Sequence, residues 1–206
     1  FFNYFRAFGL TERTGVDLPT EGTSVYYTAD QLGPVELATS AFGQSNVLTP
    51  IQLLTAVCAA VNGGNLLEPH IVSKVIDSDG NIISETQPVV RRQVVSEETS
   101  AAIADILGQT GRAYSGYYSY TKGYRAGGKS GTAEKQGGPD NEYIASFCGF
   151  APYDDPEIAV LALFDNPRKN SYYGGVVAAP CVGKILASIL PHLGIDPVYS
   201  QSELQT

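Results

Sequence analysis

The chain has 206 residues, of which 43% are hydrophobic and 17% charged, and its formal net charge is -8. This length can bury a substantial core, and this composition excludes a wholly disordered protein. Because the net charge is negative and no run of Lys or Arg occurs, nucleic acid and anionic membrane surfaces are not expected partners. We expect no apolar run of transmembrane length and no signal peptide. Methionine is absent, even at position 1, which indicates a processed or truncated product.

The cysteines and histidines are too scattered to predict a metal site. Cys58, Cys148 and Cys181 lie far apart without C-x-x-C spacing, so neither a disulfide framework nor a zinc site is expected. Cys58 and Cys181 fall in apolar helical patterns and Cys148 in a strand, and packing is the simplest role for all three. His70 and His192 have no neighbouring catalytic partner in the sequence, and no metal or cofactor is expected.

The chain begins with helix and extended connector. Residues 1–10 predict an aromatic-faced helix that stops at Gly9, and residues 14–22 an extended, turn-rich segment. The run 29–42 is ambiguous, because a Gly-Pro pair interrupts it.

A well-defined helix follows. Thr49 is a good N-cap, Pro50 suits the first helical position, and Gln52 completes a capping box. Apolar residues then recur at helical spacing until Asn62-Gly63-Gly64 ends the helix.

The middle of the chain predicts a hairpin and a second helix. Residues 70–76 alternate as a strand, 79–81 form a tight turn, and 82–83 begin a return strand. A helix runs over 96–107, with acidic residues in its first turn, and the Tyr- and Gly-rich run 111–123 reads as a loop.

The last part predicts three consecutive strands and a closing helix. A strand bearing Lys129 precedes a polar loop at 136–142, and 143–150 and 157–164 are strands joined by a short turn. Pro180 lies in the first turn of a helix with one apolar stripe. Short turns favour antiparallel pairing, so we expect an α+β fold in which an antiparallel sheet is packed with helices, without internal repeats.

The segment Gly127–Glu134 carries the strongest candidate site. It combines a fixed cation, Lys129, with the hydroxyls of Ser130 and Thr132 and a glycine, Gly131, between them. A lysine followed by Ser or Thr and then glycine is the KTG-type element of penicillin-binding proteins and serine β-lactamases. Alone, so short a pattern also describes a solvated lysine and two β-forming residues at a strand end, so the rest of the chain must decide.

Five separated stretches resemble one family, the class B penicillin-binding proteins, and they occur in the family's order. They are Thr14–Gly22, Phe42–Gly64, Gly128–Glu134, Phe147–Pro152 and Tyr173–Pro180. Within that family the chain is most similar to the Gram-positive division and sporulation transpeptidases. The resemblance covers nearly the whole chain and implies a β-lactamase/transpeptidase-like fold.

Two elements of that family are missing. Its nucleophilic serine lies in an S-x-x-K box, and an S-x-N motif follows; the chain has no S-x-N. Ser119–Lys122 matches S-x-x-K in letters, but it lies in a loop just ahead of Lys129, and we interpret this match as coincidence. We therefore expect residues 1–206 to be the C-terminal part of one transpeptidase domain, with the nucleophile-bearing part absent from this chain.

The resemblance implies a role for each residue of the motif. Lys129 would supply a fixed positive charge, and the Ser130 and Thr132 hydroxyls would bind the substrate carboxylate. The backbone N–H of Thr132 would stabilise the oxyanion, and Gly131 would leave room for substrate. Because alternation places Lys129 and Gly131 on one face and the two hydroxyls on the other, one substrate can reach both pairs only along the strand's edge. We therefore expect an edge strand that pairs with the substrate peptide.

The activity that the resemblance implies is that of a serine peptidoglycan D,D-transpeptidase. Its expected partners are the peptidoglycan stem peptide, β-lactam antibiotics, the N-terminal part of the same protein, and division or sporulation membrane proteins. The expected location is the extracytoplasmic face of the cell membrane, with an N-terminal helix outside this chain as anchor. Two alternatives stay open: a serine β-lactamase or D,D-carboxypeptidase of the same fold, and a non-catalytic β-lactam sensor or scaffold domain.

Overall fold

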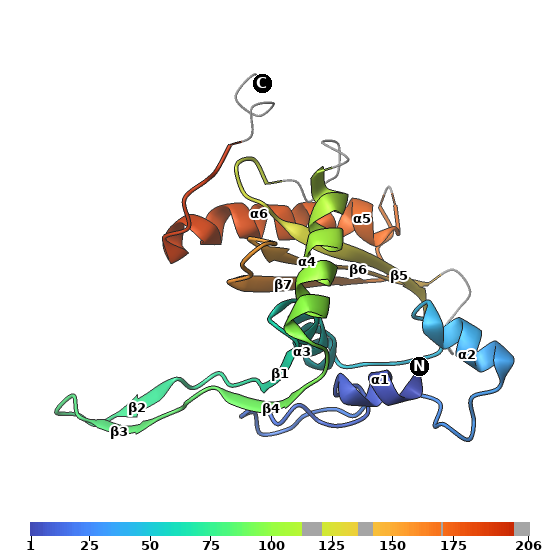
Figure 1. Cartoon of the computed structure of the whole chain (residues 1–206), viewed down its shortest axis with the longest axis horizontal. Helices are drawn as coiled ribbons and strands as arrows, with labels where there is room; N and C mark the ends of the chain where they lie inside the picture. The colour runs from blue at the N-terminus through green and yellow to red at the C-terminus, as the bar shows by residue number, and fades with distance from the viewer. Residues whose placement is uncertain (113–120, 136–141, 170, 200–206) are drawn as a thin grey trace.

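The computed structural model describes residues 1–112, 121–135, 142–169 and 171–199 (Figure 1). The helices, in chain order, are α1 (Phe2–Ala7), α2 (Pro34–Ala41), α3 (Pro50–Val61), α4 (Glu97–Arg112), α5 (Gly174–Val177), α6 (Ala179–Ile189) and the 3-10 helix η1 (Leu190–Leu193). The strands are β1 (Asn65–Glu68), β2 (Lys74–Ile76), β3 (Ile82–Glu85), β4 (Val89–Gln93), β5 (Gly127–Glu134), β6 (Tyr143–Ala151) and β7 (Ile158–Asp165).

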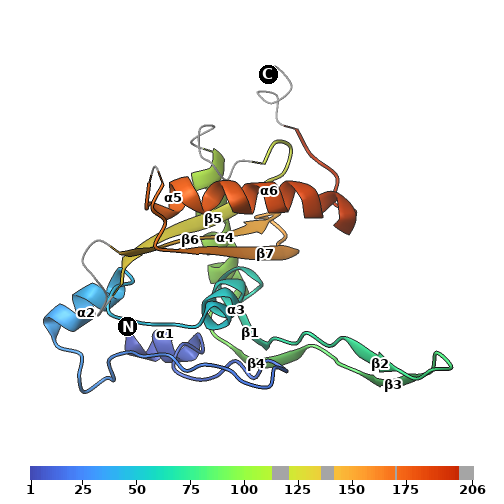
Figure 2. The same ribbon diagram turned by 180° about the vertical axis from the view of Figure 1, so that it is seen from behind.

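A three-stranded antiparallel sheet in the order β5-β6-β7 lies at the centre of the body (Figure 2). Helices α3 and α4 pack on one face, and α5 and α6 on the other. Side chains of the central strand alternate between two cores: Phe147 packs with Val182 and Leu186 of α6, and Phe150 packs with Val61 of α3 and Ala104 of α4. This arrangement confirms the predicted α+β fold and the three consecutive strands.

The local signals for the helices are largely confirmed. At the start of α3, Thr49 Oγ1 accepts from the Gln52 N–H, and the Gln52 side chain accepts from the Thr49 N–H at 3.0 Å, which is the predicted capping box. The ambiguous run 29–42 contains α2, which begins at the interrupting Pro34. Helix α4 extends beyond the predicted end to Arg112, and Gly108 within it lies against the Tyr153 ring. The predicted loops 111–123 and 136–142 lie mostly outside the described residues.

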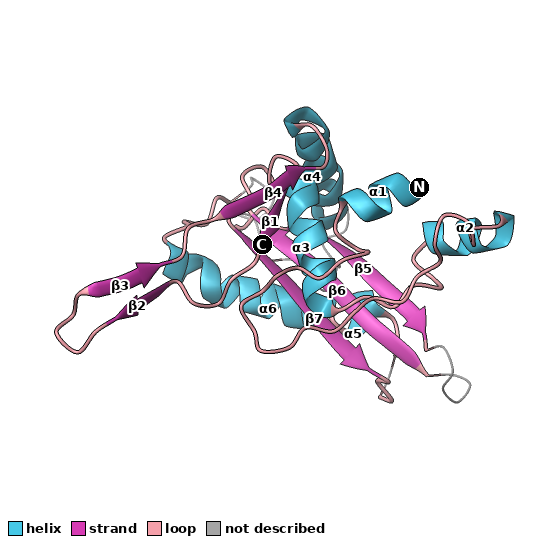
Figure 3. Ribbon diagram, turned by 90° about the horizontal axis from the view of Figure 1, so that it is seen from below, coloured by secondary structure: helices cyan, strands magenta, loops and turns pink. Residues whose placement is uncertain are grey.

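A long arm leaves the body (Figure 3). Strands β1 and β4 pair at its base, and β2 and β3 form its outer hairpin. The prediction of one strand over 70–76 was wrong, since β2 begins at Lys74. The reason is that the N–H groups of Ile71 and Val72 donate to the Asp17 carboxylate at 2.7 and 2.9 Å, instead of to a strand. The sequence analysis also missed β1 and β4.

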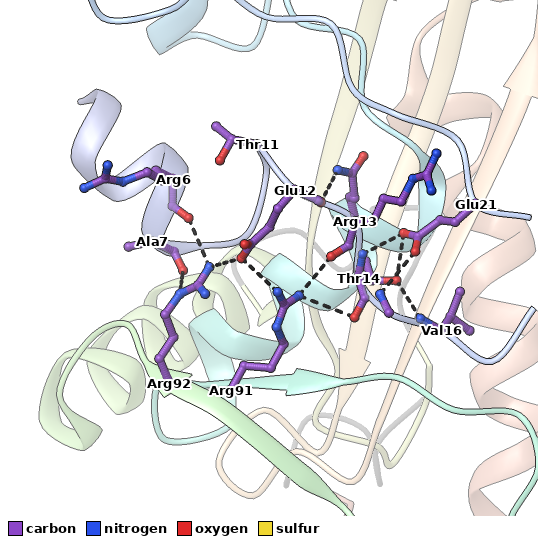
Figure 4. A network of polar contacts seen from close by, with 12 residues as sticks. Arg6, Ala7, Thr11, Glu12, Arg13, Thr14, Val16, Glu21, Arg91 and Arg92 are labelled. Carbon is purple, nitrogen blue, oxygen red and sulfur yellow. Dashed lines mark hydrogen bonds and ion pairs between the residues drawn. The ribbon is translucent and has the colours of Figure 1, made fainter.

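The end of α1 and the segment after it contact β4 through polar groups (Figure 4). Arg91 and Arg92 both form ion pairs with Glu12. Arg91 also donates to the Arg13 carbonyl at 3.0 Å, and Arg92 donates to the Ala7 carbonyl at 2.7 Å. These contacts fix the N-terminal segment to the base of the arm.

The helical run 174–193 corrects one expectation from the sequence. It has 20 residues and a mean hydropathy of 1.6, which is long and apolar enough to cross a membrane by length and composition. However, Val182, Leu186 and Leu190 on its apolar stripe are fully or almost fully buried against the sheet. We therefore assign this run to the core of the domain.

Candidate active site

Glycines at the start of β5 allow other backbone segments to approach it. A Cβ on Gly127 would lie 3.1 Å from the backbone N of Gly108 in α4, and one on Gly128 would lie 2.7 Å from the Cys148 carbonyl oxygen. Both distances are shorter than ordinary van der Waals contact, so a side chain at either position would force its neighbours apart. The first two residues of β5 are therefore closely packed against α4 and β6.

The motif residues alternate between the two faces of the sheet as predicted. The Gly174 N–H of α5 donates to Thr132 Oγ1 at 3.0 Å, so Thr132 and Ser130 lie on the α5 face. Lys129 and Gly131 lie on the opposite face, where Cys148 and Ser146 are their directly opposed residues on β6. The four residues therefore belong to one strand but form two pairs on different sides of it.

Strand β5 lies at the edge of its sheet among the described strands, as expected. The Lys135 N–H donates to the Glu142 carbonyl at 2.9 Å, one residue beyond the last pair of the two strands, Glu134 with Tyr143, and continues their register. In an antiparallel strand, the backbone N–H and C=O groups of every second residue point toward the same neighbouring strand. Gly131 lies four residues before Lys135, so its backbone groups also bond to β6. The N–H and C=O groups of Ser130 and Thr132 therefore point away from β6. The Thr132 N–H thus faces the outer edge of the sheet.

The lysine of the motif is exposed beside this edge. Its Nζ donates to the Ser130 carbonyl oxygen at 2.8 Å. Among the described residues, no acidic side chain forms an ion pair with Lys129, whereas Lys135, six residues later, is paired with Glu142 and Asp165. Lys129 therefore presents its positive charge at the strand edge.

Gly131 has a different nearest neighbour from the one expected. A Cβ at this position would lie 2.5 Å from Ser146 Oγ on β6, on the face of the sheet opposite α5. The absence of a side chain therefore serves contacts within the protein, in addition to any room it leaves for a substrate.

Two other features near the motif have structural explanations. Cys148 is buried, and this burial raises the pKa of its thiol to about 12, so the thiolate is not formed at neutral pH. Tyr143, Tyr172 and Tyr173 form a row with ring centroids 4.3 and 4.5 Å apart. The Tyr172 hydroxyl donates to that of Tyr173, and this bond raises the pKa of Tyr172.

Other candidate groups do not assemble into a second site. Ser119 lies outside the described residues, and Thr121, from the same S-x-x-K match, is buried and donates to the Gly183 carbonyl. An open pocket of about 510 Å³ lies between α3, α4 and the turn after β6, and its lining includes no residue of β5. In the described part of the chain, no cluster of three or more His, Cys, Asp or Glu could hold a metal ion.

The sequence analysis missed the contact between Gly174 and Thr132. It interpreted Tyr173–Pro180 only as the start of the last helix. A signal was present, because two adjacent glycines after a tyrosine permit a close backbone approach. The residue that Gly174 approaches, Thr132, lies 42 residues away in the chain, and only the folded structure identifies it.

Comparison with known proteins identifies relatives of this chain. The chain is 44% identical over 206 residues to Stage V sporulation protein D of Bacillus subtilis, covering 98% of this chain and 32% of that protein. It is 30% identical over 198 residues to the peptidoglycan D,D-transpeptidase FtsI of Escherichia coli, covering 94% of this chain and 32% of that protein. The chain thus spans about a third of the length of these relatives.

Solved structures share the fold. Penicillin binding protein 3 of Mycobacterium tuberculosis, complexed with ampicillin, superimposes with a TM-score of 0.84 at 28% identity, over 97% of this chain and 47% of that one. A peptidoglycan synthetase from Bifidobacterium adolescentis also gives a TM-score of 0.84, at 23% identity over 97% of this chain and 36% of that one. The β-lactamase/transpeptidase-like fold is therefore confirmed.

The family assignment follows from the length of the match. The model of the penicillin binding protein transpeptidase domain matches residues 1–187. The matched region contains β5, the α5 contact and all but the end of α6. This chain therefore belongs to the penicillin binding protein transpeptidase domain family.

Proposed function

We propose that this chain is the C-terminal part of the catalytic domain of a serine peptidoglycan D,D-transpeptidase. The attacking serine would lie in a part of the domain that these 206 residues do not include. The threefold greater length of the relatives and the absence of an S-x-N motif from the sequence support this division.

The proposed chemistry is acyl transfer. The serine attacks the carbonyl carbon of the D-Ala-D-Ala peptide bond, the terminal D-Ala leaves with its amine protonated, and an amine of a neighbouring stem peptide then displaces the serine. Such a reaction needs an activated hydroxyl, hydrogen-bond donors for the oxyanion, and a group that binds the terminal carboxylate. This chain would supply the last two.

The observation that carries the proposal is the direction of the Thr132 backbone. Its N–H points toward the outer edge of the sheet, where it can donate to an oxyanion. Lys129 is exposed beside the same edge and supplies the charge that attracts a carboxylate. The hydroxyls of Ser130 and Thr132 would hydrogen-bond that carboxylate, so a peptide that lies along β5 meets all of these groups.

The proposed partners follow from this chemistry. The stem peptide is the substrate, and β-lactams would acylate the same serine; the Mycobacterium tuberculosis relative was solved with ampicillin and with aztreonam. We further propose that the full-length protein lies on the extracytoplasmic face of the cell membrane, anchored by an N-terminal helix. There it would meet division or sporulation membrane proteins.

The test uses the full-length protein and a fluorescent penicillin. We expect stable covalent labelling, and we expect Lys129→Ala to slow acylation by about a hundredfold or more, as for the loss of one transition-state donor. Lys184→Ala, which removes an exposed lysine of α6, is the matched control and should leave the rate unchanged.

Three outcomes would contradict the proposal. Rapid hydrolysis of the penicillin would indicate a β-lactamase, and the absence of an S-x-x-K box from the full-length sequence would indicate a sensor or scaffold. Labelling of these 206 residues alone would show that the nucleophile belongs to this chain, with Ser119 of the S-x-x-K match as the first candidate.

A further inference from the structure

The start of α5 lies directly on the face of β5 that carries the two hydroxyls. The N–H of Gly174 donates to Thr132 Oγ1 at 3.0 Å, and Gly174 is buried. Gly175, the next residue, lies over Ser130, because a Cβ built on it would be 3.9 Å from Ser130 Cβ. A four-residue helix thus covers both hydroxyl-bearing positions of the motif.

Only glycine permits this contact at position 174. A Cβ at Gly174 would lie 2.1 Å from the Ser146 carbonyl oxygen and 2.2 Å from the Gly131 carbonyl oxygen. These are backbone atoms of two paired strands and cannot turn aside as a flexible side chain can. Gly175 differs, because 3.9 Å is an ordinary van der Waals distance. The two neighbouring glycines therefore have different tolerance for a methyl group.

The bond determines what the Thr132 hydroxyl can do. A threonine hydroxyl has one proton to donate and two lone pairs that accept. Because the Gly174 N–H occupies one lone pair, the hydroxyl proton points away from that N–H and stays available for another acceptor. A substrate carboxylate is such an acceptor, and hydrogen bonds to charged groups are stronger than those between neutral groups.

We propose that Gly174 is a positioning residue: its N–H holds the Thr132 hydroxyl as a donor toward the substrate carboxylate. The inference rests on the proposed transpeptidase function for the identity of the acceptor. The contact itself does not depend on that function.

The first experiment measures the second-order rate constant of acylation of the full-length protein by benzylpenicillin. We expect Gly174→Ala to lower this constant about tenfold or more, the size expected for a lost hydrogen bond to a charged group. In the matched control, Gly175→Ala, the rate constant should stay within about twofold of wild type, because the added methyl group would lie at an ordinary van der Waals distance of 3.9 Å from Ser130 Cβ.

A double-mutant cycle with Thr132→Val separates positioning from general damage. Valine removes the hydroxyl and keeps the shape, so in that background Gly174→Ala should lower the rate constant by a smaller factor than in wild type, because only the cost of displaced backbone remains. Losses that multiply would show that Gly174 acts independently of Thr132 and would overturn the inference. Equal losses for Gly174→Ala and Gly175→Ala would overturn it as well.

Hydrogen exchange tests the contact even if Gly174→Ala does not fold. We expect the Gly174 amide to exchange faster in Thr132→Val than in wild type, and to stay protected in Thr132→Ser, which keeps an acceptor oxygen. Unchanged exchange in Thr132→Val would overturn the inference. If the wild-type protein is not acylated at all, the proposed function fails, and the carboxylate role of Thr132 fails with it.

Discussion

The β5-β6-β7 sheet and the β2–β3 hairpin of the arm are built from similar residues, but these residues are buried in the sheet and exposed in the hairpin. In the sheet, Phe147 and Phe150 are 4% and 0% exposed, each in a core with helices on its side. In the arm, Ile76, Ile82 and Ile83 are 56%, 58% and 67% exposed. The sheet therefore owes its stability to burial on both faces, whereas the outer hairpin has no core of its own.

The arm is held instead at its base. The Asp17 carboxylate accepts the N–H groups of Ile71 and Val72, and the Arg91 and Arg92 side chains bond to the segment after α1. An isolated two-stranded hairpin is marginally stable in water, so these polar contacts are what orients the arm. β propensity alone therefore does not distinguish a core strand from an exposed one.

The largest effect is expected in the sheet. Phe150→Ala removes a fully buried ring between α3 and α4 and should lower the free energy of unfolding by about 3–5 kcal/mol. Denaturant unfolding of the protein would measure this loss. A loss below about 1 kcal/mol would mean that the core on this face of the sheet is loosely packed.

An intermediate and local effect is expected at the base of the arm. Hydrogen bonds from the Val72 and Ile71 N–H groups hold the pKa of Asp17 below its ordinary value of 3.8. A lowered folded-state pKa contributes stability that is present above the unfolded pKa and is lost as the pH falls through the folded pKa. We therefore expect Asp17→Asn to speed amide exchange at Ile71 and Val72 at neutral pH, and the wild type to approach the variant well below pH 3.8.

Asp79→Asn, at the tip of the same arm, is the control for that measurement. It changes the net charge equally and should leave the exchange at Ile71 and Val72 as it is. Equal acceleration in both variants would mean that overall charge, and not the Asp17 contact, holds the base.

The smallest effect is expected in the outer hairpin. Ile83→Ala removes an exposed side chain, so the free energy of unfolding should change by less than about 0.5 kcal/mol. The measurement is the same denaturant titration as for Phe150→Ala. A loss of 2 kcal/mol or more would erase the contrast between the two regions, since it would show that the arm is packed against another part of the protein.

Much of the fold could be predicted because its signals are local. The capping box of α3, the short turn between β6 and β7, and the apolar stripe of α6 each lie within a few residues. Strands β1 and β4 were missed because each is short and its partner lies across the whole arm. The strand 70–76 was overextended because Asp17, more than fifty residues earlier, takes the N–H groups that a strand neighbour would use.

By itself, the sequence determined which residues of the motif carry charge and hydroxyl groups, and that alternation divides them between two faces. The tertiary structure decided the rest. It placed β5 at an edge of the sheet, directed the Thr132 N–H outward, and brought Gly174 onto the Thr132 hydroxyl. The physical reason is that side-chain alternation follows from the backbone of a single strand, whereas an edge and a long-range hydrogen bond exist only once distant segments have packed together.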